Sequence, residues 1–161
     1  MERAAGHLAE HPEDGPATDS AAVAVHDGGL RVRVDGKHGA IHTDMTKAVG
    51  GDEAAPSPGW LLRASLAACD VTIVAMEAAR AGIKLTHLEV SVESSSDSRG
   101  ILGVDDSVEP GPLAVDVRIR LAADDASSEQ LREIAERAEA RSPVRDAVAR
   151  AVPVTTEITT S

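Results

Sequence analysis

The sequence contains almost no aromatic side chains: it has one Trp and neither Tyr nor Phe. Proteins that bind single-stranded nucleic acids usually stack bases on exposed aromatic rings. Basic residues are also in the minority, because 16 Lys and Arg stand against 27 Asp and Glu, which gives a net charge of −11. Such a chain repels phosphate backbones and anionic lipids. Nucleic acid and membrane are therefore not expected among its partners.

Cysteine occurs once, at Cys69. A single thiol cannot form an intrachain disulfide or a thiolate zinc cluster, so disulfide scaffolds and zinc fingers are excluded. The sequence also lacks a Gly-rich phosphate loop, a G-x-S-x-G elbow and an H-E-x-x-H motif. We expect neither a metal nor a cofactor, and any redox chemistry has to use Cys69.

Long apolar runs are missing as well, and no run approaches the roughly 18 apolar residues of a membrane span. The first 20 residues hold five acids, one Arg and two Pro, where a signal peptide needs an apolar stretch. We therefore expect a cytoplasmic protein. This composition predicts a disordered acidic tail over residues 1–20, followed by one domain over residues 21–161.

Alternating apolar and polar residues predict the strands. Residues 21–26 and 30–34 flank an Asp-Gly-Gly turn and predict a β-hairpin, with a third short strand over residues 40–43. Residues 85–95 and 113–121 predict two half-buried strands, joined by a long loop. Residues 152–158 predict a final strand.

Helical periodicity predicts one long helix between Pro58 and Gly82, with a stripe formed by Leu62, Leu66, Cys69, Ile73 and Met76. Ser127 and Gln130 form a capping box that opens a second helix, and Ser142-Pro143 fits the start of a third, short helix. The strands are segregated from the helices, which favours an α+β fold: small antiparallel sheets around a long central helix. With few bulky side chains, such a domain is expected to complete its core by dimerising.

Around Cys69, the helical neighbours Ser65 and Thr72 supply hydroxyls, and neither is a cation. A thiol in the middle of an apolar helix most often behaves as a small hydrophobe. Trp60, at the start of the long helix, fits either core packing or the mouth of a pocket. These residues leave open whether Cys69 is reactive or an inert core residue.

Five segments follow one another in a distinctive order: residues 50–58, the helix LLRASLAACDVTIVAMEAARAGIKL, the loop VESSSDSRGILG, ARSPVRDAV and the following Val-Pro-Val. Together they resemble the OsmC/Ohr family. The resemblance implies an α+β fold in which two chains intertwine around long central helices, each adding three-stranded sheets to the other. It also implies a bacterial protein of the oxidative or osmotic stress response. In this family a reactive cysteine on the central helix, supported by an Arg and a Glu, reduces organic hydroperoxides, and a second cysteine resolves the sulfenic acid.

Carried over by this resemblance, the peroxide-attacking cysteine falls on Cys69. The resolving cysteine falls on Ser142 and the supporting Glu on Gly59, so two of the four functional positions differ in this chain. Arg31 and Arg33 are the candidates for the supporting Arg. The resemblance thus implies a one-cysteine organic hydroperoxide reductase, which needs an external thiol to return the sulfenic acid to a thiol.

A second interpretation is a non-catalytic dimeric binding protein. A pocket at the dimer interface, lined by Ala, Leu, Val and Ile, would hold a small apolar or acyl ligand, with Cys69 in its wall. Ser142, Ser65, Thr72 and Trp60 are the candidate binding residues. A structural or regulatory dimer without a ligand is a third interpretation, and no sequence feature supports it.

Overall fold

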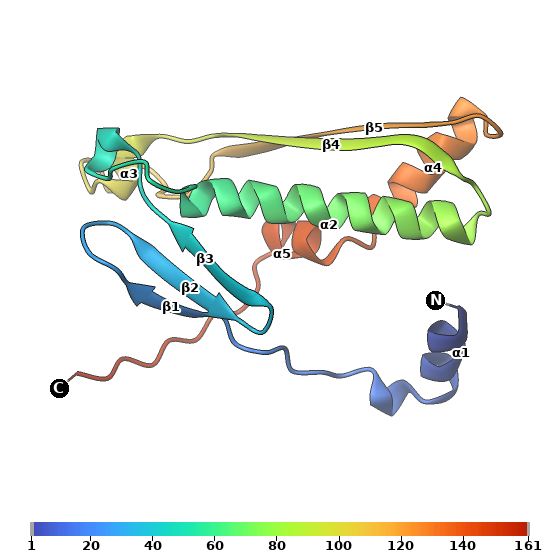
Figure 1. Cartoon of the computed structure of the whole chain (residues 1–161), viewed down its shortest axis with the longest axis horizontal. Helices are drawn as coiled ribbons and strands as arrows, with labels where there is room; N and C mark the ends of the chain where they lie inside the picture. Colours follow the sequence, from blue (N-terminus) through green and yellow to red (C-terminus); the bar gives the residue numbers. More distant parts are fainter. Residues whose placement is uncertain (1, 161) are drawn as a thin grey trace. The chain divides into compact units, whose positions relative to one another are not determined.

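The computed structural model describes residues 2–160 and consists of two compact units, residues 1–57 and 58–161 (Figure 1). Unit 1 begins with helix α1 (Glu2–Glu10) and a short 3-10 helix, η1 (Pro12–Asp14). The side chains described in these two helices are all exposed. A division into a tail and a single domain at residue 20 remains a prediction.

Unit 1 then forms a three-stranded antiparallel sheet in the order β1 (Val23–His26), β2 (Val32–Gly36) and β3 (Gly39–Thr43). The predicted hairpin and third strand are confirmed, with Ala24 opposite Val34 and Val34 opposite Ile41. Gly28 and Gly29 both have positive φ in the turn between β1 and β2. Glycine adopts such φ values without the steric cost that other residues incur, so the Asp-Gly-Gly sequence favours this turn.

The carboxylate of Asp44 organises the loop after β3, which also contains the 3-10 helix η2 (Lys47–Val49). It accepts backbone N–H groups from Met45 at 2.8 Å, Asp52 at 3.1 Å and Ala54 at 3.0 Å. The Ala54 N–H lowers the pKa of Asp44 most; burial opposes it, and the other two N–H groups and the charge of Arg31 add to the lowering. The loop is therefore held by an ionised carboxylate.

Unit 2 is built on helix α2 (Pro58–Arg80) and a two-stranded antiparallel sheet of β4 (Leu85–Ser95) and β5 (Ala114–Ala123). Both long strands run along α2 (Figure 1). Gly82 follows α2 with a φ of +69°, the left-handed conformation that commonly ends a helix. The long helix and the two half-buried strands are confirmed, and the connection between the strands contains a short helix, α3 (Ser98–Ile101).

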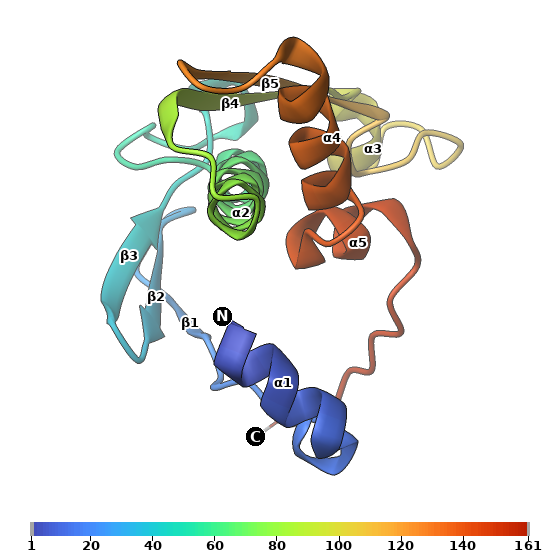
Figure 2. The same cartoon turned by 90° about the vertical axis from the view of Figure 1, so that its right-hand side faces the viewer.

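Helix α4 (Ser128–Glu139) lies beside α2 under the same sheet (Figure 2). The predicted capping box is present: Ser127 Oγ accepts the Gln130 N–H at 3.2 Å, and the Gln130 side chain accepts the Ser127 N–H at 2.9 Å. Helix α5 (Pro143–Ala149) follows as predicted. The fully buried apolar core consists of Val74, Ala78, Ile134 and Ala138. This core holds α4 against α2.

The predicted strand over residues 152–158 is wrong, since residues 151–160 form no regular element. Val154 is 86% exposed and Ile158 is 83% exposed. A strand needs a neighbour that accepts and donates its backbone hydrogen bonds, and neither sheet pairs with this segment. An alternating sequence alone does not supply that neighbour.

The buried face of α2 also differs from the predicted stripe. Its fully buried residues are Leu66, Asp70, Val74, Glu77 and Ala78. Of the predicted stripe, Cys69 is only half-buried, and Leu62 is 37% exposed. The buried face of α2 is thus displaced from the predicted face by about one residue, or about 100° around the helix axis. The reason is that Asp70 and Glu77 meet arginines from later segments, so the side that carries them can face inward.

Helix α2 is long and apolar enough to cross a membrane by length and composition, with a hydropathy of 1.4 over its most apolar window. The expectation that no segment of the chain is long and apolar enough for a membrane span is therefore wrong by length and composition. A single helix of this kind is weak evidence for a membrane span, because core helices pass the same test. The buried, arginine-paired carboxylates of Asp70 and Glu77 are typical of a helix packed inside a protein.

Candidate functional site

Cys69 lies in the middle of α2 and is half-buried. Ser142, the N-cap residue of α5, packs against it: the Ser142 hydroxyl donates a hydrogen bond to Cys69 Sγ at 3.4 Å. The same Oγ accepts the backbone N–H of Arg145 at 3.4 Å, as a helix cap does. Ser142 is only 1% exposed. The fold therefore brings together the two positions that the sequence analysis related to a thiol pair, although 73 residues separate them.

The next residue on α2, Asp70, forms an ion pair with α5. Its Oδ2 accepts a hydrogen bond from Arg145 Nη2 at 2.5 Å, and the two side chains are 2% and 24% exposed. Arg145 Nη1 also lies 3.4 Å from Glu139 Oε1. Sequence reasoning missed this arginine. The signal for it was an acid in the middle of an apolar helix, which requires a cationic partner when it is buried.

Two turns further along α2, the buried carboxylate of Glu77 is surrounded by three arginines. Arg141 Nη1 lies 2.8 Å from Glu77 Oε1, Arg80 Nη1 lies 2.5 Å from the same oxygen, and Arg137 Nε lies 3.5 Å from Oε2. Burial is the largest single influence and would raise the pKa of Glu77. The hydrogen bonds and charges of Arg141 and Arg80 outweigh it, so this pKa lies below its ordinary value. Glu77 therefore ties the end of α4 to α2.

The other predicted neighbours of Cys69 do not direct their hydroxyls towards it. Ser65 Oγ donates to the Leu62 carbonyl at 2.8 Å, and Thr72 Oγ1 donates to the Ala68 carbonyl at 2.9 Å. Both side chains are exposed on α2. Trp60 is 49% exposed and so is not part of the core. Roles for these three residues in binding remain predictions.

Arg31 and Arg33 belong to unit 1, where both side chains are exposed. Arg33 Nη2 lies 2.6 Å from Asp35 Oδ1 in strand β2, and Arg31 precedes that strand. Their assignment to the site of Cys69 remains a prediction. Gly59, the position of the expected supporting Glu, lies in the first turn of α2 and has no side chain to offer. Within residues 2–160, no three His, Cys, Asp or Glu residues form a group suited to a metal ion.

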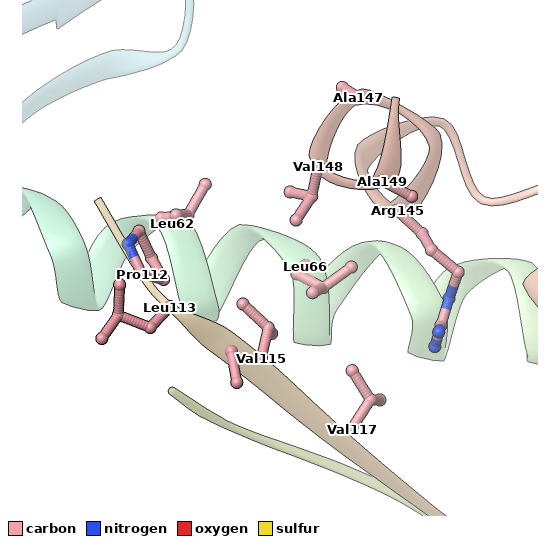
Figure 3. A pocket seen from close by; sticks show the side chains of 11 residues that line it. Leu62, Leu66, Pro112, Leu113, Val115, Val117, Arg145, Ala147, Val148 and Ala149 are labelled. Atoms are coloured by element: carbon pink, nitrogen blue, oxygen red, sulfur yellow. The ribbon is translucent and has the colours of Figure 1, made fainter. Parts of the chain in front are cut away.

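A pocket of about 560 Å³ lies between α2, β5 and α5 in unit 2 (Figure 3). Figure 3 shows Leu62 and Leu113 at one end and Arg145 at the other. The wall is apolar apart from Arg145 and is formed by Leu62, Leu66, Pro112, Leu113, Ala114, Val115, Val117, Ala147, Val148 and Ala149. Cys69 does not line it. A small ligand in this pocket would contact apolar side chains and one guanidinium group.

These elements define an α+β protein in which a long apolar helix carries a single cysteine, held against the N-terminus of a short helix. The sequence model of the family described as OsmC-like protein matches residues 50–157. Because this match spans more than half of the chain, the chain belongs to the OsmC/Ohr family of OsmC-like proteins. The predicted family and its α+β fold class are thereby confirmed. The chain matches none of the curated proteins.

Solved structures share the fold. An OsmC organic hydroperoxide resistance protein from Legionella pneumophila is 20% identical, with a TM-score of 0.61 and coverage of 83% of this chain and 90% of that one. An OsmC-like protein of unknown function from Vibrio cholerae is 12% identical, with a TM-score of 0.68 and coverage of 81% and 94%. The organic hydroperoxide resistance protein OhrB of Bacillus subtilis is 19% identical, with a TM-score of 0.55 and coverage of 81% and 90%. At these identities the similarity establishes the fold alone.

Proposed function

We propose that the chain is a one-cysteine organic hydroperoxide reductase in which Cys69 attacks the peroxide. The observation that carries the proposal is the contact between Cys69 Sγ and the Ser142 hydroxyl at 3.4 Å. It places a polar hydrogen-bond donor, and no second thiol, next to the only thiol in the sequence. A thiol in a purely apolar wall would lack such a donor.

The reaction begins with the Cys69 thiolate, which attacks the terminal oxygen of an organic hydroperoxide. A sulfur–oxygen bond forms, the O–O bond breaks, and the alkoxide leaves and takes up a proton as the alcohol. The sulfur is oxidised by two electrons to a sulfenic acid. A first external thiol then forms a mixed disulfide with Cys69 and releases water. A second external thiol returns Cys69 to the thiol and leaves as an external disulfide.

The working form in this proposal is a homodimer that uses α2 as part of its interface. Only 17% of the most apolar 18-residue window of α2 is buried within the chain. Small exposed residues follow one another along this helix at spacings of three and four: Ser65, Ala68, Thr72, Ala75 and Ala79. Small residues let two helices approach closely, and a partner copy would cover the apolar surface.

The cellular role we propose is defence against organic hydroperoxides in a bacterial cytoplasm, as part of an oxidative or osmotic stress response. The support is family membership, together with structural neighbours whose names describe organic hydroperoxide resistance. The net charge of −11 disfavours nucleic acid and anionic lipid as partners. The expected partners are thus a second copy, a small hydroperoxide and a thiol reductant.

One observation favours a second function, the non-catalytic binding of a small apolar or acyl ligand. The pocket of about 560 Å³ in unit 2 is largely apolar, and Cys69 is not among its lining residues. A ligand could therefore occupy it without meeting the thiol. In this alternative the contacts around Cys69 serve packing, and the pocket belongs to the surface where two copies meet.

The two functions are separated by intact-protein mass spectrometry after one equivalent of cumene hydroperoxide, with dimedone present to trap sulfenic acid. The reductase predicts rapid gain of one dimedone adduct in the wild type and none in Cys69→Ser. Absence of the adduct in folded wild-type protein would rule out the reductase. A search for co-purified acyl ligands by native mass spectrometry would then test the binding protein.

A further inference from the structure

We propose that the Ser142 hydroxyl is a catalytic hydrogen-bond donor to the sulfur of Cys69, and that Asp70 and Arg145 are the positioning pair that holds it there. The inference rests on the proposed reaction of Cys69. Ser142 would act on the sulfur both before and after its oxidation. The ion pair next to the thiol would serve to hold Ser142 in place.

The hydrogen-bond pattern fixes the direction in which the hydroxyl donates. Ser142 Oγ already accepts the backbone N–H of Arg145 at 3.4 Å, as the N-cap of α5. Its proton is then available for Cys69 Sγ, which lies 3.4 Å away. A thiolate sulfur and the oxygen of a sulfenate are hydrogen-bond acceptors without a proton to donate. The same hydroxyl can therefore serve both forms of the residue.

Two adjacent contacts join α2 to α5: the hydrogen bond between Ser142 and Cys69, and the ion pair between Asp70 and Arg145. Cys69 and Asp70 are adjacent on α2, while Ser142 and Arg145 lie on the first turn of α5. The Asp70–Arg145 hydrogen bond of 2.5 Å thus fastens α5 to α2 beside the contact between the hydroxyl and the sulfur. Helix α5 has only seven residues, and this ion pair ties its first turn to α2.

The ion pair between Asp70 and Arg145 leaves two buried polar atoms without a hydrogen bond among residues 2–160. The two atoms are Asp70 Oδ1 and Arg145 Nε. Buried polar atoms without partners destabilise a fold, and apolar replacement of a buried ion pair is often neutral or stabilising. An incompletely satisfied ion pair beside the contact between Ser142 and Cys69 is therefore better explained by positioning than by stability.

Replacing a resolving thiol by a hydroxyl has a chemical consequence. The hydroxyl oxygen cannot form a disulfide with Cys69, so no group of this site displaces the sulfenic oxygen. The sulfenic acid persists, stabilised by the donor, until an external thiol attacks the sulfur and water leaves. Ser142 thereby directs the oxidised site towards an external reductant.

The test compares Ser142→Ala, which removes the donor, with Ser142→Thr, which keeps a hydroxyl. The first readout is the rate at which iodoacetamide alkylates Cys69 at pH 7, because this rate does not depend on peroxide chemistry. Loss of a hydrogen bond to charged sulfur should slow alkylation about threefold to tenfold in Ser142→Ala. Ser142→Thr should recover most of the wild-type rate.

The second readout is the lifetime of the sulfenic acid after cumene hydroperoxide, followed by delayed addition of dimedone. We expect a shorter lifetime in Ser142→Ala and in Arg145→Gln than in the wild type. Ser127→Ala is the matched control: it removes the N-cap of α4, which has a similar cost in helix stability, and it does not contact Cys69. This control should leave alkylation and the sulfenic acid lifetime unchanged.

Equal alkylation rates in the wild type and Ser142→Ala would overturn the inference, as would equal slowing in Ser127→Ala. The proposed function fails in a different way, through a wild-type thiol that forms no sulfenic acid. If that thiol still shows alkylation that depends on Ser142, the hydrogen bond is upheld and only the peroxide reaction is lost. Urea unfolding of each variant separates these effects from a loss of the fold.

Discussion

The hydroxyl oxygen of Ser142 lies 3.4 Å from the sulfur of Cys69, at the position where a second sulfur would complete a thiol pair. The contact joins the middle of α2 to the first turn of α5. A cysteine at position 142 would therefore place its sulfur beside that of Cys69. The first prediction follows from this geometry.

The variant Ser142→Cys should form a disulfide with Cys69. The Ser142 oxygen lies 3.4 Å from the Cys69 sulfur, and rotation of the new side chain has to bring its sulfur to the S–S bond length of about 2.05 Å. Diamide oxidation followed by mass spectrometry should give a monomer lighter by two hydrogens and without free thiols. The control Ser95→Cys, at the exposed end of β4, should keep two alkylatable thiols. Free thiols in both variants would contradict the geometry.

The second prediction concerns the ion pair between Asp70 and Arg145. Asp70→Leu leaves the arginine without its buried partner, and we expect a loss of about 3 kcal/mol in the free energy of unfolding. The double variant Asp70→Leu, Arg145→Met places two apolar side chains in contact. It should be more stable than Asp70→Leu alone, as measured by urea unfolding. A double variant less stable than the single one would show that the pair is needed for stability itself.

Acid should weaken unit 2 through Glu77. Its pKa is lower in the folded chain than the ordinary 4.5, because Arg141 and Arg80 outweigh burial. The ionised carboxylate therefore stabilises the fold above pH 4.5, and this contribution decreases as the pH falls from 4.5 towards the lower folded pKa. Urea unfolding from pH 7 to pH 3 should show a smaller decrease in Glu77→Gln than in the wild type. Equal pH dependence in the two proteins would contradict this assignment.

The fourth prediction tests the proposed dimer surface of α2. Ala75 is one of the small exposed residues that follow one another along α2. The change Ala75→Arg introduces a long charged side chain there. Sedimentation velocity should find a dimer for the wild type and a monomer for Ala75→Arg. Ala140→Arg, an exposed change at the end of α4, should remain dimeric. A wild-type monomer at micromolar concentration would argue against the dimer.

Much of the fold could be predicted from the sequence because local signals specify it. Alternation predicted five strands that are observed, and the residues Ser127, Gln130 and Gly82 marked helix ends that the structure confirms. The final strand was wrong because strand formation depends on a neighbour, which residues 152–158 lack in either sheet. Cys69 was identifiable as the only thiol, whereas Arg145 was not identifiable from its own surroundings.

The sequence by itself determined the order of the elements, the long helix and the single thiol, since periodicity and caps act within a few residues of one another. Only the tertiary structure decided which face of α2 is buried. Asp70 and Glu77 turn inward because Arg145 and Arg141, which follow them by 75 and 64 residues, neutralise their charges. Hydropathy treats each acid as a solvent-facing residue, and the cation that permits its burial becomes visible only once the chain has folded.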